Sequence, residues 1–417
     1  MRNTDLVEPG DKGGAAQPAL RRVLGTPLLT LYGLGVIIGA GIYVLIGTVV
    51  DAAGGGAPWS FVLAGILAGL TGLCYAELAV RFPEAAGAAA YVKEAFGSDR
   101  LSQLAGLAVA AVVVVSTASI ARGSVGYIQV FISWPDAFIA GGVVALFTAI
   151  ACLGVRESVG IAAVMTTVEI GGLLLVLSAG APAVLTLPTR LDELLPGPGS
   201  IAWAGVVTGA FLAFFAFIGF ENLANMAEEA RAVERSLPRA ILYSLGLSTL
   251  LYVVVAVVVV LALPVDELTA SPAPLLLVAA QADWFSQDAF AGIALVAVAN
   301  GVLLELVMLG RLLYGMARRG WLPAGLGAIT ARLRTPVRAT VLGGAVVFAL
   351  TVALPFVSLV ALTSTITLLV FACVNLALWQ LQRRRPRSEG FRVPAIIPPL
   401  AALANVCLAA IQLFAPA

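Results

Sequence analysis

The sequence predicts an all-α membrane protein, and composition is the first reason. Its 417 residues are 60% hydrophobic and only 11% charged, whereas soluble domains are about 45–50% apolar and about 25% charged. Apolar runs of roughly 18–25 residues, the length of a helix that crosses a bilayer, recur along the chain. Helices are the expected spans, because lipid offers no hydrogen-bond partner to backbone N–H and C=O groups, which a helix pairs internally. The sequence also lacks the alternation of apolar and polar residues that is typical of a membrane β-barrel.

The apolar runs predict about eleven transmembrane helices. They are expected at residues 27–50, 58–80, 103–131, 136–153, 158–180, 201–225, 239–262, 289–314, 338–355, 358–380 and 395–414. Residues 1–25 are polar and rich in Gly and Ala, and they lack the apolar core of a cleavable signal peptide. We interpret them as a flexible cytoplasmic tail, followed by a membrane domain over 26–414.

Basic residues indicate how the chain is oriented, since Lys and Arg concentrate in cytoplasmic loops. With a cytoplasmic N-terminus, Arg190 is the only basic residue that falls in an outside loop. The outside loops otherwise carry acids, while the inside loops are rich in arginine. This asymmetry predicts a multi-pass protein of the cell (inner) membrane, and an odd number of spans leaves the C-terminus outside.

Few residues suited to metal or covalent chemistry are present. The chain has no histidine, which removes the commonest metal ligand. Its four cysteines lie in apolar stretches without CxxC spacing, where cysteine behaves as a small hydrophobe. We find no nucleophile–base pair, so we expect neither an enzyme, a metal site, a cofactor nor a nucleic-acid partner.

Glycines interrupt two of the predicted helices in mid-span. The first carries VIIGAGIYVLIG (36–47), and the sixth carries GAFLAFFAFIGFENLANMAEEA (209–230) with Gly219 beside Glu221. Glycine weakens a helix by about 1 kcal/mol relative to alanine. One explanation is close helix packing. The matched positions favour discontinuous helices in two inverted repeats, because helices five apart run in opposite directions.

Four segments give the chain a resemblance to a known family. They are IIGAGIY (37–43), CYAELAVRFPEAAGAAAYV (74–92), FFAFIGFENLANMAEEARAVERSLPRAI (214–241) and GRLLYGMARRGWLPAGL (310–326). In this order and spacing they resemble the amino acid–polyamine–organocation (APC) superfamily of transporters.

The resemblance implies a 5+5 inverted-repeat fold with broken helices 1 and 6. Repeat one is expected at about 27–180, repeat two at about 201–380 and an extra helix at about 395–414. Most relatives have twelve helices, so the last is expected to be missing, and the oligomeric state is left open.

The resemblance also implies that the breaks bind an amino acid. The residues concerned are Ile37, Gly39, Ala40, Gly41, Ile42, Phe215 and Ile218. The carboxylate is expected to meet backbone N–H groups around Gly41, and the ammonium to meet carbonyls near Ile37 and in helix 6. A half-helix N-terminus suits an anion and a C-terminal end suits a cation. Phe215 holds the place of an aromatic gate.

Ionisable residues within or near the spans are candidates for function, since a charge at mid-membrane costs on the order of 2.5–3.5 kcal/mol. Glu77 is expected to form a structural i, i+4 pair with Arg81. We interpret Arg122 as a structural partner for a buried acid. Glu221, just after the helix 6 break, is a candidate for proton sensing or for anchoring helix 6.

Two further acids bear on coupling and specificity. Glu169 lies where several relatives have a lysine that stands in for sodium. A carboxylate there could take up a proton, hold a cation or pair with Arg122. Glu305 lies in a region that faces the substrate's side chain in relatives. It would favour a cationic side chain or amine by charge pairing, or serve as a hydrogen-bonded acid between helices.

These observations predict a secondary active transporter of amino acids that works by alternating access. Proton coupling through Glu169 or Glu221 is the leading hypothesis, and cationic substrates are a possibility. The alternatives are a polyamine or organic-amine transporter, an amino acid exchanger and a non-transporting membrane sensor. The expected partners are a small-molecule substrate and membrane lipid, and the sequence leaves the substrate and the coupling ion undefined.

Overall fold

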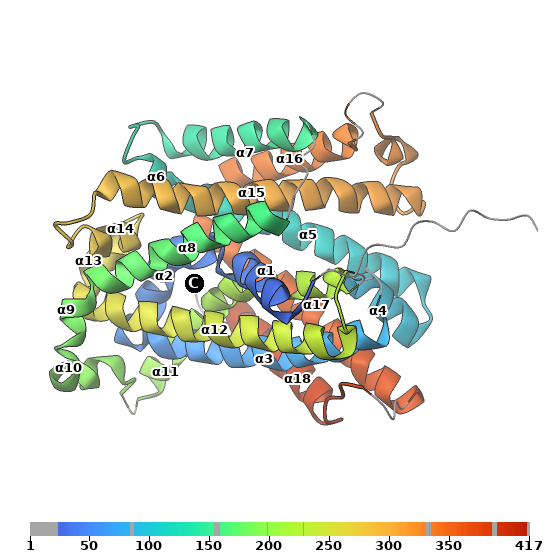
Figure 1. Ribbon diagram of the computed structural model, residues 1–417, viewed down its shortest axis with the longest axis horizontal. Helices are drawn as coiled ribbons and strands as arrows, with labels where there is room; N and C mark the ends of the chain where they lie inside the picture. Colours follow the sequence, from blue (N-terminus) through green and yellow to red (C-terminus); the bar gives the residue numbers. More distant parts are fainter. Residues whose placement is uncertain are drawn as a thin grey trace, which may run out of the picture.

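The protein is described by a computed structural model. It covers residues 24–83, 87–153, 159–197, 199–227, 229–330, 333, 335–385 and 390–414, so the predicted tail lies almost wholly outside the described residues. Within these ranges the chain is helical and forms no strand longer than an isolated bridge (Figure 1). In the described part of the chain, seven helical segments are long and apolar enough to cross a membrane, and shorter apolar helices accompany them.

The long helices coincide with the predicted apolar runs. They are α3 (Ala57–Arg81), α5 (Asp99–Gly123), α7 (Asp136–Leu153), α8 (Val159–Ala179), α12 (Val233–Ala262), α15 (Gln287–Arg318), α16 (Val337–Ala353), α17 (Phe356–Arg384) and α18 (Ile397–Phe414). Short helices connect them: α4 (Gly87–Phe96), α6 (Val125–Ile128), α9 (Ala181–Val184), α10 (Leu187–Leu194), α13 (Val265–Ala270) and α14 (Pro274–Ala279). The number of membrane crossings and the inverted repeat stay predictions.

Two of the predicted spans are interrupted. The first consists of α1 (Thr26–Ile38) and α2 (Gly41–Ala53). The sixth consists of α11 (Ser200–Ala213) and two 3₁₀ turns, η2 (Phe214–Phe217) and η3 (Phe220–Met226). The helix breaks expected from the glycines are therefore present in both places.

Small residues let α3 and α12 pack closely along their length, and the two helices run side by side in Figure 1. A Cβ added to Gly65 or Gly72 of α3 would collide with Thr249 or Leu245 of α12. Close backbone approach through small residues is the usual basis of helix association in membranes. This pair supports the interrupted helices, since α1 packs on α12 and α11 packs on α3.

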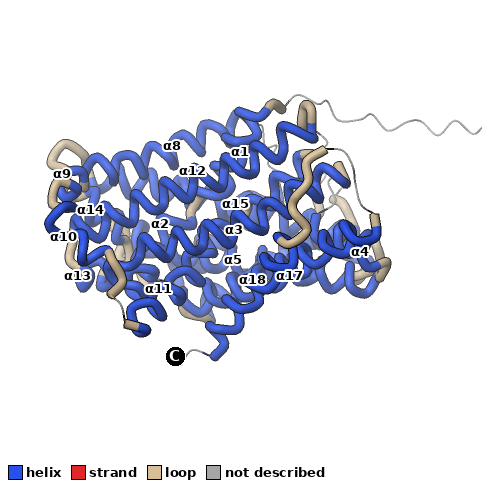
Figure 2. Tube along the Cα trace, turned by 90° about the horizontal axis from the view of Figure 1, so that it is seen from below, coloured by secondary structure: helices blue, strands red, loops and turns tan. Residues whose placement is uncertain are grey.

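The last helix, α18, lies beside α17 and also contacts α3 (Figure 2). A buried polar cluster joins the three. The Thr71 hydroxyl of α3 accepts hydrogen bonds from the Asn375 amide of α17 at 3.1 Å and the Asn405 amide of α18 at 3.0 Å. Buried hydrogen bonds of this kind fix helix register where apolar packing alone leaves it loose.

A short backbone clamp ties the start of α1 to the chain that follows η3. The Leu24 N–H donates to the Glu229 carbonyl at 3.0 Å, and the Arg231 N–H donates to the Leu24 carbonyl at 2.8 Å. These bonds form an isolated parallel bridge between Leu24 and Ala230. The two interrupted helices are thus connected at one end as well as at their centres.

Candidate functional site

The break in the first span leaves buried backbone N–H groups outside the hydrogen-bond ladder of the helix. α1 ends at Ile38, Gly39 adopts φ 14° and ψ −145°, and α2 begins at Gly41. The first hydrogen bond of α2 runs from the Val44 N–H to the Ala40 carbonyl. The N–H groups of Ala40, Gly41 and Ile42 therefore precede the helical ladder of α2, and they form the positive end of its dipole.

The break in the sixth span depends on Gly219. Its φ of +122° is open to glycine but rarely to other residues. A Cβ at this position would also stand 2.9 Å from the Val36 carbonyl oxygen of α1. The Gly219 N–H donates to Glu221 Oε2 at 2.8 Å, so the carboxylate caps the second half of the helix. The Glu221 side chain therefore contacts the break itself, and its role in anchoring the sixth span or in proton sensing stays a prediction.

The two breaks lie against each other. A Cβ added to Gly41 would stand 2.9 Å from Cα of Ala216 in η2. The hydroxyl of Tyr252 on α12 lies 2.7 Å from the Ile37 carbonyl and 3.0 Å from the Ala216 carbonyl. One buried side chain thus contacts the unwound carbonyls of both helices, and the Ile37 carbonyl keeps one lone pair for another donor.

The remaining residues expected at the breaks take these positions. Phe215 lies in η2 and is 5% exposed. Ile218, with an extended backbone, separates η2 from η3 and is half-buried. Their proposed contacts with an ammonium group and with a gate stay predictions.

Glu305 approaches the breaks from α15. Its Oε2 accepts hydrogen bonds from Ser116 at 2.7 Å and Thr117 at 2.8 Å, both on α5. One turn earlier, a Cβ at Gly301 would stand 3.6 Å from Cβ of Ala40. Glu305, on the helix that approaches the first break, is therefore held by two hydroxyl donors of α5.

Glu169 is fully buried on α8, behind the first break. Its Oε1 accepts a hydrogen bond from the Asn300 amide of α15 at 3.0 Å, and its Oε2 has no hydrogen-bond partner among the described residues. Its backbone carbonyl accepts from the Tyr43 hydroxyl of α2 at 2.5 Å. Glu169 thus connects α8, α15 and α2, and one of its carboxylate oxygens has no hydrogen-bond partner among the described residues.

Two expectations about structural charges have different outcomes. Glu77 forms the expected i, i+4 pair with Arg81, with the closest atoms 2.5 Å apart. Its Oε2 also accepts from the Gln382 amide and the Val393 N–H, each at 2.8 Å. Arg122 makes no ion pair among the described side chains, and its Nη1 is buried without a hydrogen-bond partner there.

The suggested pairing of Arg122 with Glu169 is therefore wrong for this structure. Glu169 takes a neutral amide, Asn300, as its partner instead. An amide satisfies the carboxyl oxygen without fixing the charge of the carboxyl group, whereas arginine would hold that group ionised.

Sequence reasoning missed the polar residues that hold the site together, namely Tyr43, Tyr127, Tyr252, Asn300, Ser116 and Thr117. The Tyr127 hydroxyl, for example, donates to the Tyr43 carbonyl at 2.8 Å. The available signal was an isolated hydroxyl or amide within an apolar helix. Such groups need partners in a membrane, but their spacing does not reveal which helix supplies them.

Interrupted helices with open backbone ends, set among long apolar helices, define the class of a multi-pass membrane transporter. Comparison with known proteins specifies the family. The family model described as amino acid permease matches residues 24–417. The chain belongs to this amino acid permease family, and the resemblance to the APC superfamily is confirmed.

The relatives of this chain are named for different substrates. The chain is 30% identical over 379 residues to "Cationic amino acid transporter 3, mitochondrial" of Arabidopsis thaliana, covering 86% of this chain and 62% of the relative. It is 30% identical to "Branched-chain amino acid permease BcaP" of Bacillus subtilis, over 93% of this chain and 88% of that protein. It is 29% identical to the "Methylthioribose transporter" of Bacillus subtilis, over 94% and 88%. The chain thus spans less than two thirds of the Arabidopsis relative.

Proposed function

We propose that this protein is a secondary active transporter that moves amino acids across the membrane by alternating access. The main support is the contact between the two breaks, where Gly41 approaches Ala216. The open N–H groups of α2 suit a carboxylate, and the unwound carbonyls of the sixth span suit an ammonium. An α-amino acid carries both groups on one carbon atom, so it matches two opposite helix ends placed side by side.

Glu305 supports a preference for substrates with a positive side chain. Its described hydrogen-bond partners are the hydroxyls of Ser116 and Thr117, which leave its charge uncompensated when it is ionised. Glu305 is half-buried, and a carboxylate partly shielded from water without a cation is costly, so a bound lysine or arginine would supply the missing charge. The relative named as a cationic amino acid transporter agrees with this assignment.

Glu169 is the proposed proton carrier. It lies between the interrupted first span and α15, and Asn300 contacts only one of its oxygens. Protonation of the other oxygen would remove a buried charge next to the moving helix. A proton bound there would stabilise one arrangement of α2 against α8 over another, which is the requirement for coupling.

A ligand screen by thermal shift tests the proposed substrate class, because a ligand that binds the folded state raises the melting temperature. At about 100 times its Kd a ligand adds about 2.7 kcal/mol of stability. We expect arginine and lysine to stabilise the purified protein. Glu305→Gln should abolish that shift while the protein remains folded, and Glu267→Gln, at an exposed acid on α13, should leave it unchanged.

Two results would count against this assignment. Stabilisation by small neutral amino acids alone would remove the cationic preference but retain the amino acid site. Stabilisation by polyamines, with no effect of any α-amino acid, would favour an amine transporter instead, since such a ligand has no carboxylate for the α2 end.

A further inference from the structure

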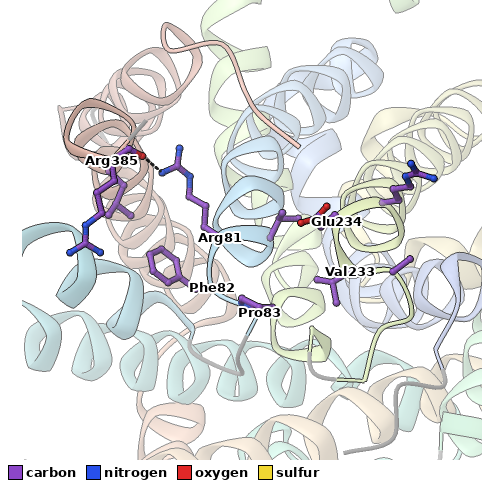
Figure 3. Close-up of a pocket in the computed structure, with 10 residues that line it drawn as sticks. Arg81, Phe82, Pro83, Val233, Glu234 and Arg385 are labelled. Atoms are coloured by element: carbon purple, nitrogen blue, oxygen red, sulfur yellow. Dashed lines mark hydrogen bonds between the residues drawn. The ribbon is translucent and has the colours of Figure 1, made fainter. Parts of the chain in front are cut away.

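A cavity of about 900 Å³ opens where α3 and α17 end and α12 begins (Figure 3). None of the residues at the two helix breaks lines it. Its lining residues are Val80, Arg81, Phe82, Pro83, Ala232, Val233, Glu234, Arg235, Leu381 and Arg385. The cavity is therefore separate from the proposed amino acid site, and it needs an explanation of its own.

Arg81 is the fixed charge of this cavity. Its Nε and Nη2 donate to Glu77 Oε1 at 2.9 and 2.5 Å, and its Nη1 donates to the Arg385 carbonyl at 3.1 Å. Figure 3 shows this last bond as a dashed line between Arg81 and Arg385, at one side of the cavity. The guanidinium group is held in place from two helices, and the acid Glu77 offsets its charge.

The other charges of the wall leave a net positive charge. Arg235 and Arg385 are exposed cations at the rim, opposed by the acid Glu234. Arg385 lies 3.8 Å from Glu94, but both side chains are in water, where such pairs contribute little. The lining residues themselves carry three arginines and one acid, and Glu77 and Glu94, which pair with two of those arginines, do not line the cavity.

Apolar groups occupy the rest of the wall. Val80, Val233 and Leu381 are buried, and Phe82 is half-buried beside them. α3 and α17 both change here from apolar sequence to arginine, at Arg81 and at Arg383–Arg385. This change marks the boundary between hydrocarbon and water. The cavity thus combines a positive rim with an apolar interior at the depth of lipid headgroups.

The start of α12 adds a further feature that suits an anion. The helix begins at Val233, and its first hydrogen bonds run from Arg235 and Ser236 back to the Ala232 carbonyl. The amide groups of the first turn precede that ladder and carry partial positive charge. Arginines and a helix N-terminus beside one cavity form a combination that binds phosphate groups in many proteins.

We propose that this cavity binds the phosphodiester headgroup of one phospholipid, with an acyl chain against Phe82 and Pro83, apolar lining residues whose side chains are not buried. The negative charge of a phosphodiester complements the excess of arginine over acid among the lining residues. The apolar interior distinguishes a lipid from a free phosphate, which would gain nothing from it. Basic pockets between membrane helices are known to hold lipid headgroups.

Native mass spectrometry of the delipidated full-length protein tests this site, with phosphatidylglycerol titrated into the detergent solution. Wild type should bind one lipid with distinctly higher affinity than further copies. The double variant Arg235→Gln and Arg385→Gln should bind that first lipid about tenfold or more weakly. It keeps the Arg385 carbonyl to which Arg81 bonds. The matched control is Arg100→Gln with Arg318→Gln, two exposed arginines outside the cavity, which should bind as wild type does.

Each other outcome contradicts the proposal. Equal loss in the control pair would mean nonspecific attraction by surface charge. Equal binding of diacylglycerol, which lacks phosphate, would mean an apolar groove alone. Displacement of the lipid by millimolar glycerol phosphate would mean a site for soluble phosphate. If the double variant bound the first lipid with unchanged affinity, Arg235 and Arg385 would take no part in lipid binding.

Discussion

Gly41 of α2 lies so close to Ala216 of η2 that a Cβ on Gly41 would stand 2.9 Å from the Ala216 Cα. Neither atom belongs to a flexible side chain, so the contact joins the two interrupted helices through their backbones. The distance between the breaks sets the distance between the groups proposed to bind the carboxylate and the ammonium of one substrate.

Gly41→Ala should therefore separate the breaks and weaken substrate binding. Overpacking of this kind costs about 1–3 kcal/mol. If this cost destabilises only the substrate-bound state, the affinity for substrate falls about five- to 150-fold. Substrate-dependent thermal shift measures the loss. Gly69→Ala on α3, where a Cβ meets nothing within 4 Å, is the control. If substrate raised the melting temperature of both variants equally, substrate binding would not depend on the close contact between the breaks.

Tyr252 should stabilise the unwound carbonyls of both spans. Tyr252→Phe removes one hydroxyl and keeps the ring, and loss of a typical hydrogen bond costs about 0.5–1.5 kcal/mol. We expect transport to fall together with a lower melting temperature. Tyr243→Phe, at a side chain on the same helix that is 54% exposed, should alter neither. Unchanged transport in Tyr252→Phe would mean that the breaks hold their shape without it.

Glu169→Gln tests proton coupling, because glutamine cannot take up a proton yet still accepts a hydrogen bond from Asn300. In proteoliposomes the variant should lose uptake driven by a pH gradient and keep substrate exchange across the membrane. If gradient-driven uptake survives, Glu169 is not the coupling group. Glu221→Gln then becomes the next variant to test, since Glu221 caps the sixth-span break.

The Glu77–Arg81 pair should matter for stability. Arg81 has a side chain only 7% exposed, and removal of one partner from a buried pair costs about 3–5 kcal/mol. Glu77→Gln should therefore lower the melting temperature markedly. Asp99→Asn removes the partner of Lys93 in a pair whose side chains are 57% and 78% exposed, and it should change the melting temperature little. Equal effects would mean that burial does not set the strength of these pairs.

The breaks were predictable from the sequence because their cause is local. Glycines within apolar helices stand out, and the φ of Gly219 explains why no other residue serves there. The partners of Glu305 were not predictable, since Ser116 and Thr117 lie 189 and 188 positions away. Which helices meet depends on packing of faces that are apolar all round, and such faces carry no periodic signal.

Arg122 shows the same limit in another form. Its charge within an apolar helix predicts an acidic partner, and Glu169 was a reasonable candidate on charge alone. The structure pairs Glu169 with Asn300, because the choice of partner depends on which helices are neighbours. The cavity where α3 and α17 end and α12 begins escaped prediction for a similar reason, as Arg81, Arg235 and Arg385 line one cavity only because three helix ends converge.

Uptake of radiolabelled arginine into proteoliposomes tests the central claim most directly. With an acidic exterior, wild-type protein should concentrate arginine above its external level, unlabelled lysine should compete, and Gly41→Ala should reduce the accumulation. A wild-type protein that binds arginine but neither accumulates nor exchanges it, whatever the pH gradient, would contradict the account.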